Sequence, residues 1–236
     1  MENKFILGII PARGGSKGIK NKNIINISGK PLINYTIESA RSSSMLSDVI
    51  VSTDSEVIAS IAKEAGATIP FIRPSELATD EATTIDVIYH AVKEYENLFK
   101  LKVDIVVILQ PTSPLRIHED IDNAIKLFID NPEFSSLISC YEANFIHPYY
   151  MYKKEGKKMI PFLDIELTGI RRQELNSVYI RNGALYISNR DLIIKQKKIV
   201  EGIPLGYIMP RERSINIDEK FDLEFAEFFI KRNKKK

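Results

Sequence analysis

Short apolar runs alternate with amphipathic stretches over the first 140 residues of the chain. The runs show no helical period and are typical of buried strands, whereas the stretches between them place apolar residues three and four positions apart, as helices do. The predicted strands span residues 5–10, 49–51, 68–72, 104–109 and 137–140, and helices are expected at 31–40, 57–65, 84–95 and 121–128. This alternation predicts an α/β fold with a mostly parallel central sheet flanked by helices.

The pattern changes after residue 141. Residues 141–182 are rich in tyrosine, proline and lysine, and two short runs flank Glu155-Gly156 as a β-hairpin would. Strands are expected again at 182–187, 203–209 and 214–217, before a final helix with phenylalanines on it. We therefore predict one domain over residues 1–236, with a small β-rich excursion at 141–182 that covers itself poorly and serves in dimerisation.

Composition excludes several classes of protein. The 236 residues carry a formal net charge of +2, whereas a general nucleic-acid binder would be strongly basic. No apolar run approaches the ~20 residues of a membrane span, and Met1 to Lys4 lead straight into the first strand, so we expect no signal peptide. A single cysteine, Cys140, excludes an intrachain disulfide and is compatible with a reducing cytoplasm.

A glycine-rich basic loop follows the first strand. Pro11 ends the ladder, glycines let the backbone turn sharply, and Arg13, Lys17 and Lys22 add positive charge with no acidic residue between Asn3 and Ile37. Such a loop at the carboxyl end of a strand predicts a phosphate site. It matches neither the P-loop nor the dinucleotide-binding pattern, and a plain loop with solvated lysines is the alternative.

Polar residues also follow the other predicted strands. Asp54, Arg73, Gln110 and Arg116 each come shortly after an apolar run. Ligands of parallel α/β sheets bind beyond the carboxyl ends of the strands, so these side chains and Arg13 should surround one crevice.

Asn216-Ile217-Asp218 is the candidate metal site. Two oxygen-bearing side chains two residues apart would share one face of a strand, and Mg²⁺ prefers such hard donors. The alternative is that Asp218 caps the final helix.

These motifs together resemble one family over nearly the whole chain. The segment PARGGSKGIKNKN at 11–23 resembles the CTP-binding loop of acylneuraminate cytidylyltransferases (CMP-sialic acid synthetases), and LQPTSPLR at 109–116, STD at 52–54 and the 73–80 segment recur there in the same order. The resemblance implies a Rossmann-like nucleotidyltransferase fold. It also implies nucleotide contacts from Ala12, Arg13, Gly14, Gly15, Ser16, Lys17, Lys22, Asn23, Arg73, Thr83 and Thr84, and substrate contacts from Gln110, Arg116, Arg172 and Asn182.

The implied reaction is Mg²⁺-dependent transfer of CMP from CTP to the anomeric hydroxyl of a sialic-acid-like nonulosonic acid, with release of pyrophosphate. Arg13, Lys17 and Asp218 would be the catalytic residues, Asn216 and Asp218 the metal ligands, and a homodimer the assembly, with Arg172 reaching the partner's site. The same reaction on legionaminate, pseudaminate or 3-deoxy-manno-octulosonate, or a non-catalytic nucleotide-binding protein, are the alternatives.

Three positions depart from the family pattern. The family's first metal carboxylate is here Asn216, which supplies no charge. Tyr149-Tyr150 stands where relatives often have a lysine, and Ile180 occupies the place of an arginine that here comes one residue later, as Arg181. The last two changes belong to the sugar end of the site.

Overall fold

The computed structural model describes residues 4–15, 18–143, 146–163 and 171–233. Within these ranges the main sheet has six strands in the order β10-β6-β9-β5-β1-β4. Neighbours pair in parallel except β9, which runs antiparallel to both β5 and β6. The strands are β1 (Ile6–Pro11), β4 (Asp48–Ser52), β5 (Ile105–Leu109), β6 (Ser136–Glu142), β9 (Tyr179–Asn189) and β10 (Leu205–Ile208).

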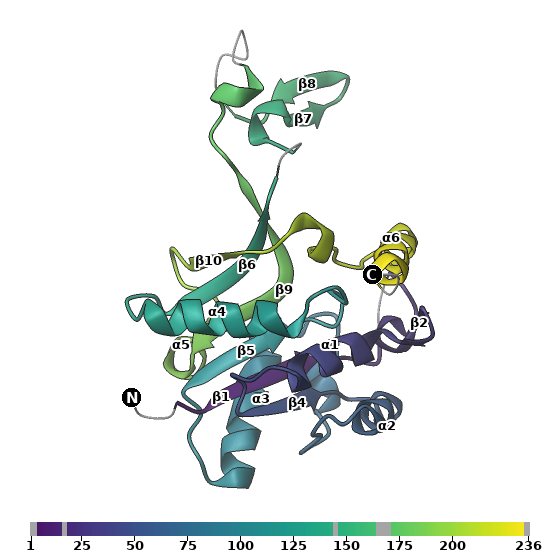
Figure 1. The fold of residues 1–236 in the computed structure, drawn as a ribbon, viewed down its shortest axis with the longest axis vertical. Helices are drawn as coiled ribbons and strands as arrows, with labels where there is room; N and C mark the ends of the chain where they lie inside the picture. Colours follow the sequence, from purple (N-terminus) through teal and green to yellow (C-terminus); the bar gives the residue numbers. More distant parts are fainter. Residues whose placement is uncertain (1–3, 16–17, 144–145, 164–170, 234–236) are drawn as a thin grey trace.

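Helices cover both faces of this sheet (Figure 1). The alternation of side chains along β1 explains the two layers: Ile6 and Ile10 pack with α1, α2 and α4, whereas Leu7 and Ile9 pack with α3 and α5. The helices are α1 (Leu32–Arg41), α2 (Glu56–Glu64), α3 (Thr84–Phe99), α4 (His118–Asp130), α5 (Arg190–Gln196) and α6 (Lys220–Asn233). The mostly parallel α/β fold predicted from the sequence is confirmed.

The last helix, α6, lies apart from these layers. Ala226 and Ile230 of α6 pack with Ile19 from the basic loop, with Ile27 and with Ile217. The short pair β2 (Asn26–Ile27) and β3 (Lys30–Pro31) lies beside it. The C-terminal segment is thereby brought against the loop that follows the first strand.

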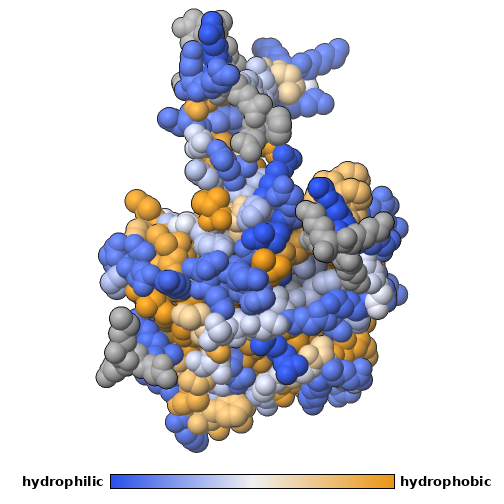
Figure 2. Space-filling model, viewed as in Figure 1, coloured by the Kyte–Doolittle hydropathy of each residue, from blue (hydrophilic) through white to orange (hydrophobic). Residues whose placement is uncertain are grey.

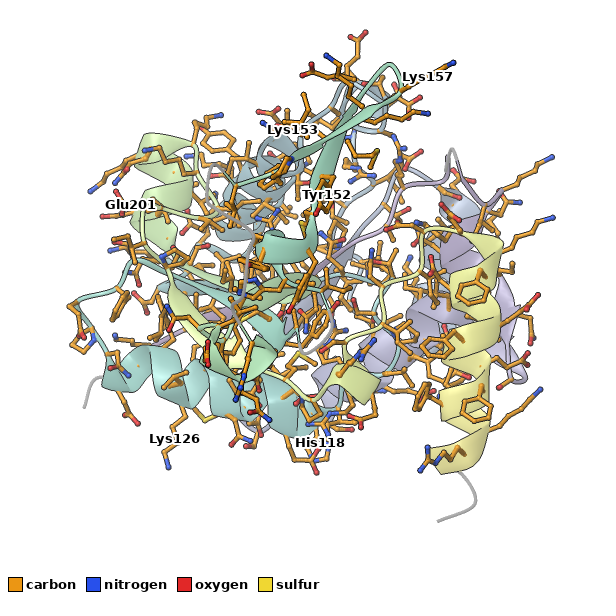
Figure 3. All side chains as sticks on the ribbon, turned by 90° about the horizontal axis from the view of Figure 1, so that it is seen from above. His118, Lys126, Tyr152, Lys153, Lys157 and Glu201 are labelled. Atoms are coloured by element: carbon orange, nitrogen blue, oxygen red, sulfur yellow. The ribbon has the colours of Figure 1, made fainter. Side chains whose placement is uncertain are left out.

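The excursion stands clear of the sheet on the extended ends of β6 and β9 (Figure 1). The predicted hairpin is present as β7 (Tyr152–Glu155) and β8 (Lys158–Pro161). Figure 3 places Tyr152 and Lys153 along this hairpin and Lys157 at its far end, while His118 and Lys126 project from the outer side of α4.

Some local predictions are wrong. The strand expected at 68–72 is reduced to one bridge between Thr68 and Ile50, because Pro70 offers no N–H to continue the ladder. Residues 214–217 form no strand, and helix α5 was not predicted. Helix α2 is capped by Ser55, which accepts from the N–H of Ile58.

None of the helices in the described ranges combines the length and the apolar character that crossing a bilayer requires.

Candidate active site

A cavity of about 530 Å³ lies at the carboxyl ends of β1 and β5. It collects most of the polar residues that the sequence places after strands, together with the start of α3. Its lining includes Arg13, Gly18, Lys22, Asn23, Arg73, Thr84, Gln110 and Asp218. Three cationic side chains and two exposed carboxylates, Asp80 and Asp218, therefore face a single space, and Asp80 pairs with Arg13. A cluster of cations of this kind is expected of a site for a phosphorylated ligand.

The basic loop is held in shape by hydrogen bonds to its neighbours. The N–H of Gly14 donates to Asp54 Oδ1 at 3.0 Å, and Asn23 Nδ2 donates to the carbonyl of Arg13 at 2.9 Å. Ala12 is buried and donates to the carbonyl of Ser52. A Cβ atom on Gly14 would lie 3.2 Å from Ser55, so glycine suits this close approach. Ser16 and Lys17 lie outside the described residues, whereas Gly15 has open space around its Cα.

Two arginines connect this loop to the segment after β4. Arg13 pairs with Asp80 at 2.8 Å and donates to the carbonyl of Thr79 at 3.0 Å. Arg73 is almost fully buried and pairs with Asp54 at 3.3 Å. Burial lowers the pKa of Arg73, and the hydrogen bond to Asp54 opposes that shift. Asp54 thus positions both Gly14 and Arg73.

The opening of α3 completes this end of the cavity. Thr83 caps the helix by accepting from the N–H of Asp86. Thr84 lines the cavity, whereas Thr83 is committed to the cap.

The Asn216–Asp218 pair lies at the edge of the cavity. Asp218 Oδ1 accepts from Lys22 Nζ at 3.1 Å, and Asp218 Oδ2 accepts from Asn216 Nδ2 at 2.5 Å. The cap of α6 comes from Asp222, which accepts from the N–H groups of Asp218 and Glu219. The Asp218 side chain is therefore directed to Lys22 and Asn216 instead of the helix, which argues against the cap alternative.

Gly18 brings the basic loop against this pair. A Cβ atom at Gly18 would lie 2.7 Å from the carbonyl oxygen of Asp218, so only glycine allows the two segments to meet. Lys22 strengthens the contact by donating to the carbonyl of Ile217 at 2.8 Å.

A second cavity, of about 760 Å³, opens on the other side of Asp218. It is lined by the bulged end of β9, by the 211–218 segment and by aromatic residues of α6. Its lining includes Tyr141, Arg181, Asn182, Tyr186, Arg211, Asn216, Asp218, Phe221 and Phe225. Figure 2 shows hydrophobic surface at the α6 corner of the body, where Phe221, Phe225 and Phe228 are exposed. This cavity suits a ligand with both polar and apolar groups.

The residues predicted to bind the sugar acid do not all line one cavity. Gln110 lines the first cavity. Arg116 is only 2% exposed and donates to the carbonyls of Gln110 and Ala184, and burial lowers its pKa to about 10. Arg116 thus holds the 110–116 loop against β9, and its described contacts favour this supporting role over substrate contact.

Asn182 borders the second cavity, but its amide is already engaged. Its Oδ1 accepts from Ser139 Oγ and from the N–H of Ala184, and its Nδ2 donates to Ser214 Oγ. It is 5% exposed. Asn182 therefore fixes the bulge in β9. The fourth predicted residue, Arg172, lies in the excursion, on the short 3-10 turn Arg172–Glu174.

A buried ion pair that the sequence analysis missed supports the 211–218 segment. Arg213 forms two hydrogen bonds, of 2.9 and 2.7 Å, to Asp120 at the start of α4, and Tyr207 OH donates to the same carboxylate at 3.4 Å. Asp120 is fully buried, and its hydrogen bonds and charge raise the pKa of Arg213. The partners are 93 residues apart, so no local spacing could have indicated them.

Histidine, cysteine, aspartate and glutamate side chains in the described ranges form no group of three that could hold a metal ion. Cys140 is buried on β6, and burial raises the pKa of its thiol, as expected of a core residue and not of a nucleophile. A metal at Asp218 would therefore depend on the bound ligand for further oxygens.

The chain is similar to several curated proteins that are named as cytidylyltransferases or CMP-sugar synthases. The chain is 37% identical to N-acylneuraminate cytidylyltransferase from Escherichia coli O18:K1:H7 over 94% of its length, but it spans only about half (51%) of that relative. It is 34% identical to pseudaminic acid cytidylyltransferase from Campylobacter jejuni over 96% of this chain and 97% of that one. It is 32% identical to CMP-N,N'-diacetyllegionaminic acid synthase from Legionella pneumophila over 97% of each chain.

Solved structures agree on the fold. CMP:2-keto-3-deoxy-manno-octonic acid synthetase, solved in complex with CTP, superposes with a TM-score of 0.71 over 98% of this chain and 100% of that chain, at 17% identity. A profile described as Cytidylyltransferase matches residues 7–222. The resemblance seen in the motifs is thus confirmed, and the chain belongs to the cytidylyltransferase family.

Proposed function

We propose that this protein transfers CMP from CTP to the anomeric hydroxyl of a nonulosonic acid of the sialic acid type. The hydroxyl oxygen forms a bond to the α-phosphorus of CTP, and the bond from that phosphorus to the β-phosphate oxygen breaks. Pyrophosphate leaves, and the hydroxyl proton passes to solvent. The products are a CMP-sugar and pyrophosphate.

The observation that carries the proposal is the position of Asp218 in the lining of both cavities. The first cavity has the cations and the glycine loop that a nucleoside triphosphate requires. The second has the mixed polar and aromatic lining that suits a sugar acid. The one residue common to the two linings would then lie where the hydroxyl meets the α-phosphate.

The chain's own residues would act by positioning and by charge. Arg13, Lys17, Lys22 and Arg73 would neutralise the triphosphate as negative charge shifts to the leaving pyrophosphate. Thr84 and the backbone of residues 12–15 would orient the nucleotide. Gln110, at the end of β5, would contact the acceptor from the nucleotide side.

Mg²⁺ is the metal we propose for this site. Asp218 supplies one carboxylate on an exposed side chain. Asn216 donates to this carboxylate through Nδ2, and its Oδ1 is the atom that could serve as a metal ligand. Mg²⁺ is ordinarily held by one or two carboxylates with phosphate oxygens and water. The residues present fit that requirement. When bound, the ion would polarise the phosphate oxygens and stabilise the charge of the leaving group.

The acceptor is the least constrained part of the proposal. Relatives at similar identity are named for N-acylneuraminate, pseudaminic acid and diacetyllegionaminic acid. These acids share the 2-keto acid core and differ in substituents farther along the chain. We favour N-acylneuraminate, named in the relative with 37% identity, and keep the others as arms of the test.

Pyrophosphate release from CTP tests the proposal. Purified protein with Mg²⁺ should release pyrophosphate only when a sugar acid is added, and mass spectrometry should identify the CMP-sugar. N-acetylneuraminate, legionaminate, pseudaminate and 3-deoxy-manno-octulosonate would be compared at equal concentration. CTP binding without turnover of any acid would instead support a non-catalytic nucleotide-binding protein.

We also propose a cytoplasmic homodimer assembled through the excursion. Exposed apolar side chains gather there, including Tyr152, Met159 and Phe162. CTP as co-substrate and a single cysteine suit the cytoplasm. Light scattering should give about twice the 26.9 kDa of one chain, and a monomer at micromolar protein would contradict both the dimer and a shared site through Arg172.

A further inference from the structure

His90 lies on α3, one turn farther along the helix than the residues that line the first cavity. Thr84 and Val87 of α3 belong to that lining. Residues three positions apart are neighbours on a helix, so His90 follows Val87 on the same side. His90 itself is absent from the lining and is partly buried. Its side chain is therefore a neighbour of the first cavity that does not contact the space for the ligand.

The ring of His90 packs against the segment that carries Arg73. Its centroid lies 5.3 Å from that of the Phe71 ring, and the two rings are nearly perpendicular, at 83°. Phe71 comes two residues before Arg73, which lines the first cavity. The same segment is also held just after β4, because the N–H of Arg73 donates to the carbonyl of Thr53 at 2.8 Å and its guanidinium pairs with Asp54. His90 is thus one of the supports that fix the position of a buried cation.

The protonation state of this ring matters because one of its nitrogens is buried. Nδ1 of His90 has no hydrogen-bond partner in the part of the chain that the structure describes. A neutral ring can leave this nitrogen without a proton, whereas a charged ring carries a proton on both nitrogens. A buried N–H without an acceptor is destabilising, so a charged ring would have to turn toward water and leave its contact with Phe71.

Charged groups act on His90 from three elements. Arg73 belongs to the segment after β4, Glu76 to the short 3-10 turn that follows it, and Glu94 to the next turn of α3. Burial lowers the pKa of His90 most, and the charge of Arg73 lowers it further. The two carboxylates oppose this change but do not reverse it. The ring is therefore neutral at pH 7 and gains its charge only in acid, near a cation that is itself buried.

We propose that His90 is a positioning residue that makes nucleotide binding in the first cavity sensitive to pH. The neutral ring supports Phe71 and so keeps Arg73 in place. A charged ring gives up that support and repels Arg73, so nucleotide affinity falls in acid. It attracts the phosphates only from a distance, since His90 does not line the cavity. The inference rests on the proposed function, because it takes CTP as the ligand of this cavity.

Calorimetry of CTP binding at pH 7.5 and pH 5 tests the inference. From the higher to the lower pH, the affinity of the wild type should fall roughly 3- to 10-fold more than that of His90→Phe, which keeps an aromatic ring against Phe71 but has no nitrogen to protonate. The variant also corrects for protonation of the nucleotide, because both proteins bind the same CTP. His118→Phe, the same substitution on the outer side of α4, is the control and should behave like the wild type. An equal pH dependence in the wild type and His90→Phe would overturn the inference.

A proton NMR titration of the wild type is a second test that needs no variant. Because protonation of His90 weakens CTP binding, CTP must by linkage lower the pKa of His90. A pKa that CTP leaves unchanged or raises would overturn the inference, even if His90→Phe does not fold. Neither measurement needs a sugar acid. Turnover with a pH-independent affinity for CTP would contradict this inference alone, whereas pH-dependent binding without turnover would contradict only the proposed transfer reaction.

Discussion

The two cavities that share Asp218 are built in different ways. The first is assembled from loops that directly follow parallel strands β1, β4 and β5, and its arginines are tied to carboxylates. The second is assembled from an antiparallel bulged strand, a segment with one short 3-10 turn at Arg211–Arg213, and a helix with exposed phenylalanines. The sheet thus determines the shape of the first cavity, which we propose binds the nucleotide. The second cavity, proposed for the acceptor, depends on irregular contacts between segments that are distant in the sequence.

Under the proposed function, this difference corresponds to the ligand that each cavity would recognise. A triphosphate is the same in every reaction of this family, and a loop with fixed N–H groups and cations suits it. Acceptors differ among the relatives, whose names include three different sugar acids. Because few strands of the sheet line the second cavity, substitutions in its lining can change which acceptor it binds without altering the basic loop.

The largest effect is expected at the residue that the cavities share. Asp218→Ala should lower turnover by about 100-fold or more, since it removes the charged group nearest the reacting atoms. Asn216→Asp should shift the Mg²⁺ dependence to lower concentration because it adds a second carboxylate. Initial rates over a Mg²⁺ titration measure both effects. Full activity of Asp218→Ser at unchanged Mg²⁺ dependence would show that the metal binds elsewhere.

The second prediction concerns the support of the acceptor end alone. Arg213→Ala removes the cation that pairs with the buried Asp120. Because the Arg213 side chain is itself 29% exposed, we expect a loss of about 1.5–3 kcal/mol, the range of a hydrogen bond to a charged group. Unfolding in urea should show this loss, and the KM for the sugar acid should rise more than the KM for CTP. Lys126→Ala, which removes an exposed cation on the outer side of α4, is the control for stability. Equal stability of both variants would contradict the structural role given to the Asp120–Arg213 pair.

A substitution in the basic loop should affect the nucleotide end alone. Arg13→Ala removes a charge-assisted contact to the triphosphate and should cost about 1.5–3 kcal/mol in transition-state binding, seen mainly in the KM for CTP. The same is expected of Lys17→Ala. Asp80→Asn removes the ion-pair partner of Arg13 but not the cation, so its kinetics should stay close to the wild type. Wild-type kinetics in Arg13→Ala would show that the loop is not the phosphate site.

The smallest effect is expected where neither cavity is involved. Glu96 accepts two hydrogen bonds from Arg190 beside the amino end of β5. Burial alone would raise the pKa of Glu96, but the hydrogen bonds from Arg190 and from the N–H of Val103 lower it overall. A lowered pKa means that the pair stabilises the fold above the ordinary pKa of glutamate, and that this stability is lost as pH falls through the folded-state value.

Glu96→Gln should therefore cost about 1–2 kcal/mol at pH 7 and less at pH 3, with unchanged KM values for both substrates. Urea unfolding at the two pH values measures the difference. Glu64→Gln, on the exposed side of α2, is the matched control. A larger loss at pH 3 than at pH 7 would mean that the sign given to the pKa shift is incorrect.

The sequence predicts that residues such as Arg13, Arg73 and Gln110 meet in one cavity, because the signals for the strands they follow are local. Strand, glycine loop and cations at 5–23 follow one another directly in the sequence, although contacts with Asp54 and Asp218 hold the loop in its final shape. The cap of α3 also depends on neighbours in the sequence, because Thr83 accepts from the N–H of Asp86. The wrong predictions occur where another constraint outweighs the local pattern. Pro70 interrupts the apolar run at 68–72, and the Asp54 carboxylate accepts hydrogen bonds from Gly14 and Arg73.

The acceptor end lacks such signals. Apolar alternation predicts a strand at 182–187, but not the bulge that brings Arg181 beside Tyr186, because the bulge depends on Ser139 in another strand. The burial of Arg116 and Asn182 likewise depends on carbonyls and hydroxyls contributed by remote segments. Residue type and spacing single out Arg116 and Asn182, but they do not show whether these side chains contact the ligand or support the residues that line the cavity.

The contact between Gly18 and Asp218 has a consequence for how the protein is made. A ribosome releases the basic loop early and the 217–218 segment some 200 residues later. The parallel strands and their helices can assemble in the meantime, but Lys22 has nothing to bind at Ile217 and Asp218 until that segment arrives. A nascent chain can therefore form most of its sheet before the cavity lined by Asp218 is complete, and under the proposed function the reaction with CTP would wait for the C-terminal segment.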